Sequence, residues 1–115
     1  PRSEWRVGQD LDTGRVTIEV RDHEGAATIE PHQFFHSAEG RERYSVLPHD
    51  PQSAEGEVTW VHEMSRDGWA VRTETWTRLT SDAENFHISA TLRAWCDGTL
   101  EREHDFAASI PRQFS

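Results

Sequence analysis

Apolar and polar residues alternate with a two-residue period along much of this chain, as in β-strands that bury one face. The cleanest run is 86–96, where Phe86, Ile88 and Leu92 share one face. The same period predicts strands at 14–21, near 26–30, and at 41–47, 58–64, 69–79 and 99–106. No stretch has the convincing period of an amphipathic helix, so the pattern predicts an all-β chain.

Short turn sequences separate these runs. Asp67-Gly68 and Asp97-Gly98 are dipeptides that favour tight hairpin turns. Pro48 and Pro51 restrict the backbone and predict a rigid, non-helical corner. Six or seven strands at such short intervals predict an antiparallel β-sandwich. The length of 115 residues suits one domain, spanning 1–115.

Composition and charge narrow the class of partner. The formal net charge is −9, which repels phosphate backbones and anionic lipid headgroups, so nucleic acid and membrane surfaces are poor partners. Every basic residue is arginine, which excludes Schiff-base and other lysine chemistry. Cys96 is the single cysteine, and we expect it to be a small buried hydrophobe. One cysteine and no signal-peptide pattern weakly indicate a bacterial cytoplasm.

The sequence carries no motif that would place a catalytic nucleophile, a phosphate group or a zinc ion. His49, Asp50 and Ser53 invite comparison with a Ser-His-Asp triad. They lack the strained turn that exposes a nucleophile, and we expect Asp50 to cap the proline-bounded turn instead. We therefore predict that this chain has no catalytic residue of its own.

No cofactor and no metal site are expected. His32 and His36 have the spacing of one helical face, but their neighbours do not support a helix, so solvated imidazoles are favoured. Asp82, Glu84 and Asn85 offer too few oxygen ligands to make a calcium cage.

Four of the five tryptophans divide into two pairs. Trp60 and Trp69 share their faces with apolar neighbours and are predicted to lie in the core. Trp76 and Trp95 stand among charged residues and are predicted to lie on wetter faces. The candidate contact site for another domain comprises Trp76, Trp95, Arg78 and Arg93. Two alternatives are a site for a carbohydrate or hydrophobic ligand at the same tryptophans, and a homodimer joined through an unpaired sheet edge.

An ordered series of short segments resembles the C-terminal region of the CocE/NonD hydrolases, relatives of the X-Pro dipeptidyl-peptidases. The segments are Tyr44-Ser45-Val46, Asp50-Pro51-Gln52-Ser53-Ala54, Arg66-Asp67-Gly68-Trp69-Ala70-Val71, Phe86-His87-Ile88, Leu92-Arg93-Ala94 and Ile110-Pro111-Arg112. They span about the last two thirds of the chain, whereas Gly25 to Gly40 matches weakly.

The resemblance implies a jelly-roll-like β-sandwich that forms the C-terminal part of a larger hydrolase. In that family the sandwich packs on an α/β-hydrolase domain, which carries the Ser-His-Asp triad and is the expected partner. The resemblance further implies that this chain is a non-catalytic accessory domain. Its parent would act on esters, amides or X-Pro peptides. No nucleophile elbow is present, so no catalytic residue is transferred from the family to this chain.

Overall fold

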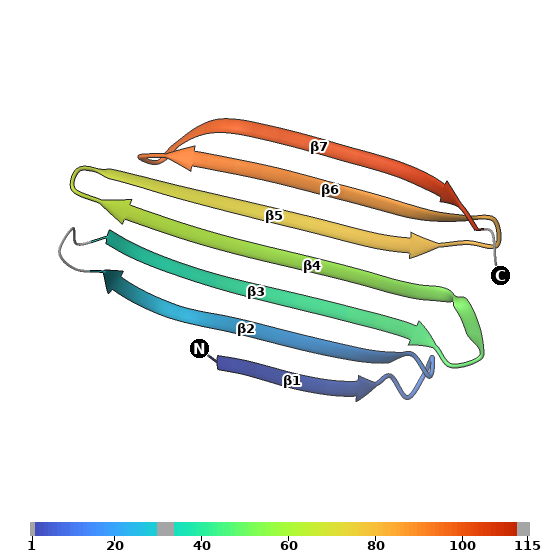
Figure 1. Ribbon diagram of the computed structural model, residues 1–115. Helices are drawn as coiled ribbons and strands as arrows, with labels where there is room; N and C mark the ends of the chain where they lie inside the picture. Colours follow the sequence, from blue (N-terminus) through green and yellow to red (C-terminus); the bar gives the residue numbers. More distant parts are fainter. Residues whose placement is uncertain (1, 30–33, 113–115) are drawn as a thin grey trace.

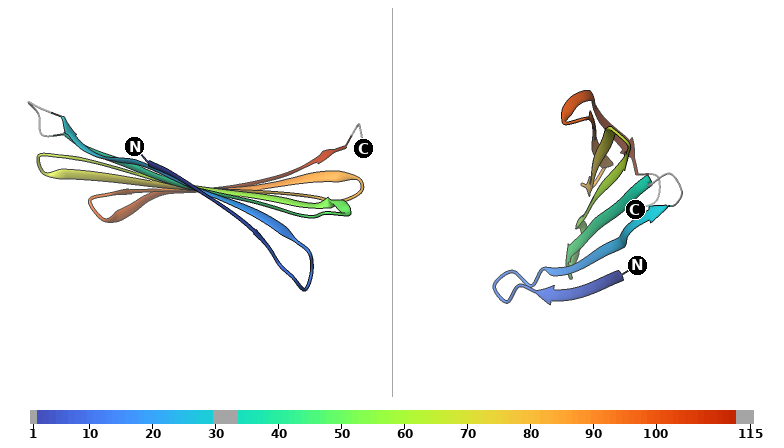
Figure 2. Two further views of the ribbon diagram at one scale, coloured as in Figure 1. Left: turned by 90° about the horizontal axis from the view of Figure 1, so that it is seen from below. Right: turned by 90° about the vertical axis from the view of Figure 1, so that its left-hand side faces the viewer.

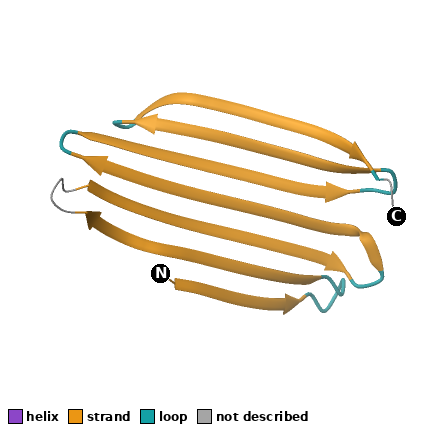
Figure 3. Ribbon diagram, in the orientation of Figure 1, coloured by secondary structure: helices purple, strands orange, loops and turns teal. Residues whose placement is uncertain are grey.

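The computed structural model describes residues 2–29 and 34–112, which form seven β-strands in a single antiparallel sheet (Figure 1). The strands are β1 (Arg2–Gln9), β2 (Val16–Ile29), β3 (Phe34–Leu47), β4 (Asp50–Arg66), β5 (Trp69–Ser81), β6 (Asn85–Cys96) and β7 (Thr99–Pro111). Their order in the sheet is their order in the sequence, so every strand pairs with its neighbours along the chain. Strands and connecting turns account for all the described residues (Figure 3).

The prediction of an all-β antiparallel fold is confirmed, but the described residues form one layer rather than the expected two-layer sandwich. Edge-on, the strands lie in one strongly twisted sheet (Figure 2). Residue alternation identifies strands and their two faces, but it does not say which strands pair. Here each connection returns the chain beside the strand that it has just left, so no strand crosses to a second sheet.

The predicted strands are all present and are longer than expected. Strand β2 joins the two segments predicted at 14–21 and near 26–30, with a register shift between His23 and Ala26 and a positive φ of 83° at Gly25. Glu30, the last residue of that prediction, lies outside the described residues. Strand β1 was missed because Arg2–Gln9 is mostly polar and carries only a short alternation.

The cross-strand register divides the side chains between two faces. One, called here the apolar face, carries large hydrophobic side chains on every strand: Trp5, Val7, Val16, Ile18, Val20, Phe34, Tyr44, Val46, Val58, Trp60, Met64, Trp69, Val71, Leu79, Phe86, Ile88, Leu92, Phe106 and Ile110. The other, the polar face, carries Arg2, Glu4, Arg6, Glu19, Arg21, Glu39, Arg41, Arg43, Glu55, Glu57, Glu63, Arg72, Glu74, Arg78, Arg93, Glu103 and Asp105. Each strand is therefore amphipathic.

Almost nothing covers the apolar face. Among the described residues, only Val20 and Ala38 are buried hydrophobic residues. The solvent-accessible area is 8472 Å², whereas a compact monomer of this mass exposes about 6,400 Å². The radius of gyration is 18.1 Å, against about 13 Å for a compact domain of this length. The molecule is one layer of a protein architecture that ordinarily needs two.

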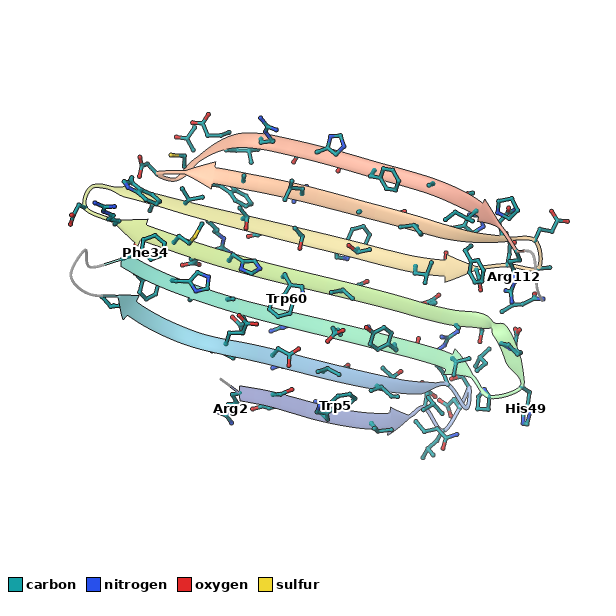
Figure 4. The ribbon with its side chains drawn as sticks, viewed as in Figure 1. Arg2, Trp5, Phe34, His49, Trp60 and Arg112 are labelled. Carbon is teal, nitrogen blue, oxygen red and sulfur yellow. The ribbon has the colours of Figure 1, made fainter. Side chains whose placement is uncertain are left out.

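One part of the apolar face is closed by the chain itself. Trp60 of β4 lies across Gly40 of β3, its cross-strand partner (Figure 4). A Cβ atom added at Gly40 would lie 2.5 Å from the indole ring. The His62 ring stacks on Trp60 with 5.7 Å between ring centroids. The Trp60 ring occupies the space that a side chain at position 40 would need. This close approach explains why the position is a glycine.

We predict that Gly40→Ala destabilises the protein by about 2 kcal/mol, because the added methyl group displaces the Trp60 ring from its packing. Denaturant unfolding followed by tryptophan fluorescence measures this change. Gly8→Ala in β1 is the matched control, since a Cβ atom there meets nothing within 4 Å. Equal stability of the two variants would contradict the role of Trp60.

Candidate interaction surface

The four residues predicted to contact another domain lie on adjacent strands of the polar face. Trp76 and Arg78 belong to β5, and Trp95 and Arg93 belong to β6. Both tryptophans are half-buried, although they stand on the polar face as predicted. The Arg72 guanidinium lies 6.0 Å from the centroid of the Trp95 ring and partly shields it.

The arginines of this site are engaged within the sheet. Arg93 Nε donates to Glu103 Oε2 at 2.6 Å, and this contact raises the pKa of Arg93. Arg78 pairs with Glu55 at 3.7 Å. Arg72 donates to both Glu63 and Glu74, at 3.1 and 2.8 Å. The polar face is a lattice of exposed ion pairs, each of which adds little to stability.

The apolar face contains an open hollow of about 510 Å³ near the chain's β3–β4 turn. Its walls come from five strands, β2 to β6, and include Ile18, Tyr44, Val58 and Leu79. Gly56 of β4 lies at its centre, paired with Tyr44 on one side and with Leu79 on the other. The sequence analysis missed this hollow because alternation along single strands does not show which residues of different strands lie together. The available signal was a glycine inside a strand.

The Asp50–Ala54 segment is a structural corner. Ser53 Oγ accepts a hydrogen bond from Leu47 N at 2.7 Å and donates one to Asp50 O at 2.6 Å. The predicted capping role of Asp50 is confirmed, since its Oδ1 accepts a bond from Gln52 N at 3.1 Å. His49 points away from the sheet (Figure 4), and no hydrogen bond joins it to Ser53 within the described residues.

A serine, a histidine and an aspartate meet elsewhere, at positions that the sequence analysis did not connect with one another. The ring of His87 bonds Ser109 Oγ through Nδ1 and Asp82 Oδ2 through Nε2, both at 2.8 Å. The other oxygen of Asp82, Oδ1, accepts bonds from the backbone N–H groups of Glu84 and Asn85. Together with the His87 bond, these contacts lower the pKa of Asp82 to about 2.

Arg112 completes this cluster. Its backbone N donates to Glu84 O at 2.8 Å, its Nη1 donates to Asp82 O at 3.1 Å, and its guanidinium lies 4.8 Å from the Phe86 ring centroid. We call Asp82, His87, Ser109 and Arg112 the clasp.

The clasp has the residue types of a Ser-His-Asp triad, but acyl transfer at Ser109 would need free oxyanion donors. The N–H groups of Glu84, Asn85 and Arg112 already have partners. We interpret the clasp as a structural connection, in which these hydrogen bonds join the β5–β6 turn to the end of β7.

The residues considered as metal ligands have other roles or fall elsewhere. Asp82 uses both carboxylate oxygens within the clasp. His36 lies in strand β3 rather than on a helix, and His32 is outside the described residues. Residues 2–29 and 34–112 contain no group of three or more His, Cys, Asp or Glu side chains placed to hold a metal ion. Cys96 is half-buried on the apolar face rather than fully buried.

Comparison with known proteins identifies no relative, so a function can be inferred only from the sequence and the geometry of the sheet. No family model, no curated protein and no solved structure matches this chain. Within the described residues, no helix has the length and hydropathy needed to span a membrane. What the fold defines is a class: an antiparallel all-β protein whose single sheet has one apolar and one charged face.

The clasp predicts a pH dependence of stability. Because the folded-state pKa of Asp82 is about 2, below its ordinary value of 3.8, the ionised carboxylate stabilises the fold above pH 4. That contribution is lost as the pH falls from about 4 to 2. In His87→Ala, the main cause of the shift is removed, and we expect the pKa of Asp82 to rise toward 3.8.

Carboxyl-carbon NMR titration of Asp82 measures both values. Thr91→Ala is the control, because Thr91 lies on the same strand and face but bonds Asp105 instead. A pKa for Asp82 that is the same with and without His87 would contradict the clasp geometry.

Proposed function

We propose that this chain is a non-catalytic accessory sheet that packs by its apolar face against another layer of a larger serine hydrolase. The observation that carries the proposal is the uncovered apolar face. Trp5, Leu79, Phe106 and Ile110 are each more than a third exposed, and they lie on one side of the sheet. Contiguous apolar surface of this kind marks an interaction site.

The exposed area has the size of a real interface. The chain exposes 8472 Å², which is roughly 2,000 Å² more than a compact monomer of its mass. Stable interfaces bury roughly 800 Å² on each partner, and permanent ones bury more. A covering layer that removes this excess would give the sheet the hydrophobic core that its own residues do not form.

The resemblance to the CocE/NonD hydrolases supports the identity of that layer. The segments that carry the resemblance have structural roles in this chain: Asp50–Ala54 forms the corner before β4, and Arg112 belongs to the clasp. Residues that shape a sheet suit a domain that supports an active site located elsewhere. We therefore propose an α/β-hydrolase domain as the partner, in a parent enzyme that acts on esters, amides or X-Pro peptides.

The predicted contact residues Trp76, Trp95, Arg78 and Arg93 enter this proposal in a secondary role. They lie on the polar face, opposite the exposed hydrophobic residues, and their arginines are already paired. We assign the main domain contact to the apolar face. A further contact through the half-buried Trp95 would use the polar side of the same sheet.

A second candidate function is the binding of a small apolar ligand in the hollow around Gly56. A volume of about 510 Å³ falls within the ordinary range of ligand sites, roughly 300–1,000 Å³. Carbohydrate binding has less support, because the tryptophans considered for it are half-buried among ion pairs.

The proposal predicts no ester hydrolysis by the purified 115-residue chain. With p-nitrophenyl acetate, we expect the rate to equal that of buffer, and the rates of Ser53→Ala and Ser109→Ala to be unchanged. A rate proportional to protein concentration that either substitution abolishes would show a catalytic serine in this chain and overturn the proposal.

A paired substitution tests the docking face in the intact protein from the source organism. Phe106→Glu places a charge on the apolar face, and Ala107→Glu places the same charge on the polar face of the same strand. If the apolar face is covered, Phe106→Glu costs about 2 kcal/mol or more, because an unpaired charge is buried. We expect Ala107→Glu to be nearly neutral. Equal melting temperatures would mean that the apolar face is free, contrary to the proposal.

A further inference from the structure

Two glycines lie inside central strands on the apolar face, Gly40 of β3 and Gly56 of β4. Neither is among the residues with positive φ, so backbone conformation does not require a glycine at either position. A glycine within a strand weakens it and commonly marks the close approach of another group. Gly40 has such a group, since Trp60 occupies its place.

Gly56 is less closely covered within the described chain. The ring of Tyr44, its cross-strand partner, would lie 3.3 Å from an added Cβ atom, a tight contact but not the overlap that Trp60 makes at Gly40. Leu79 and Phe86 line the hollow and are both more than a third exposed. The result is a depression in the apolar face with hydrophobic walls and no internal occupant.

Charge indicates the chemistry of the occupant. Among the described strand residues that the register pairs, the charged ones on the apolar face are Asp22, Glu42, Arg66 and Arg102, two acids and two bases. The net charge of −9 therefore resides mainly elsewhere, and the charged residue that lines the hollow, Glu55, is paired with Arg78. An uncharged, apolar group fits this environment.

The size of the exposed apolar face distinguishes a covering protein from a free ligand. A ligand matched to the hollow would leave Trp5, Leu92 and Phe106 uncovered, since these residues do not line it. The excess exposed area of roughly 2,000 Å² calls for a covering surface across the whole face. We infer that the Gly56 hollow receives one bulky aliphatic or aromatic side chain from the layer that covers the apolar face. This inference rests on the proposed function and specifies its central contact.

Filling the hollow from within tests the inference in the intact protein. Gly56→Val adds a branched side chain where the incoming group would lie, and we expect the melting temperature to fall by about 5 °C through overpacking. Gly8→Val is the matched control. Gly8 lies on the polar face of the edge strand β1, and an added Cβ atom there meets nothing within 4 Å. We expect no loss there. An unchanged or raised melting temperature for Gly56→Val would overturn the inference.

Photocrosslinking identifies the occupant. p-Benzoyl-phenylalanine is placed at Leu79, which lines the hollow, or at Leu92, on the apolar face away from it. The same probe at Ala107, an exposed position on the polar face of β7 that does not line the hollow, is the control. We expect light to join Leu79 to a bulky apolar residue of the parent protein outside this sheet, and Ala107 to give no such product.

Other products separate the two proposals. Attachment of Leu92 to the parent protein, with Leu79 joined to a small apolar molecule or to nothing, would reject the occupant and leave the docking proposal standing. Attachment of both positions to a second copy of this chain would reject the occupant and the proposed partner together. Failure of both positions to crosslink to any protein would likewise reject both.

Discussion

Backbone hydrogen bonding between strands that are neighbours in the sequence holds this structure together. Every described strand pairs with the one before or after it, and among the described residues no backbone pairing joins non-neighbouring strands. Side-chain burial contributes little, because Val20 and Ala38 are the only buried hydrophobic residues in the part of the chain that the structure describes. Burial of apolar area is the main favourable term in folding, so a sheet with one exposed apolar face lacks most of that term. The need for a cover follows from this deficit.

The sequence was sufficient for the local structure. The alternation at 86–96 and the dipeptides Asp67-Gly68 and Asp97-Gly98 predicted strands and turns where the sheet has them. These features are local: a two-residue period fixes the direction of side chains, and a positive φ at Gly68 or Gly98 fixes a tight turn. The grouping of Trp60 with Trp69, apart from Trp76 and Trp95, follows from the same period.

What sequence reasoning could not supply was the relation between distant positions. Alternation along a strand does not reveal that seven strands form one layer, because pairing depends on the whole chain. The clasp joins Asp82 to Ser109 across two strands, and no spacing rule brings them together. The half-burial of Trp76 and Trp95 depends on cross-strand neighbours such as Arg72, which lies opposite Trp95.

The strictly sequential pairing also shapes how the molecule comes apart. A sheet in which the backbone of each strand pairs only with its neighbours in the sequence resembles a short linear array, whose stability is approximately a sum of nearest-neighbour terms. Loss of β1 removes only its ladder with β2, and the pairing of β3 through β7 is left in place. Opening therefore starts at either edge and advances strand by strand, while the central strands β3, β4 and β5, which lie farthest from both edges, separate last.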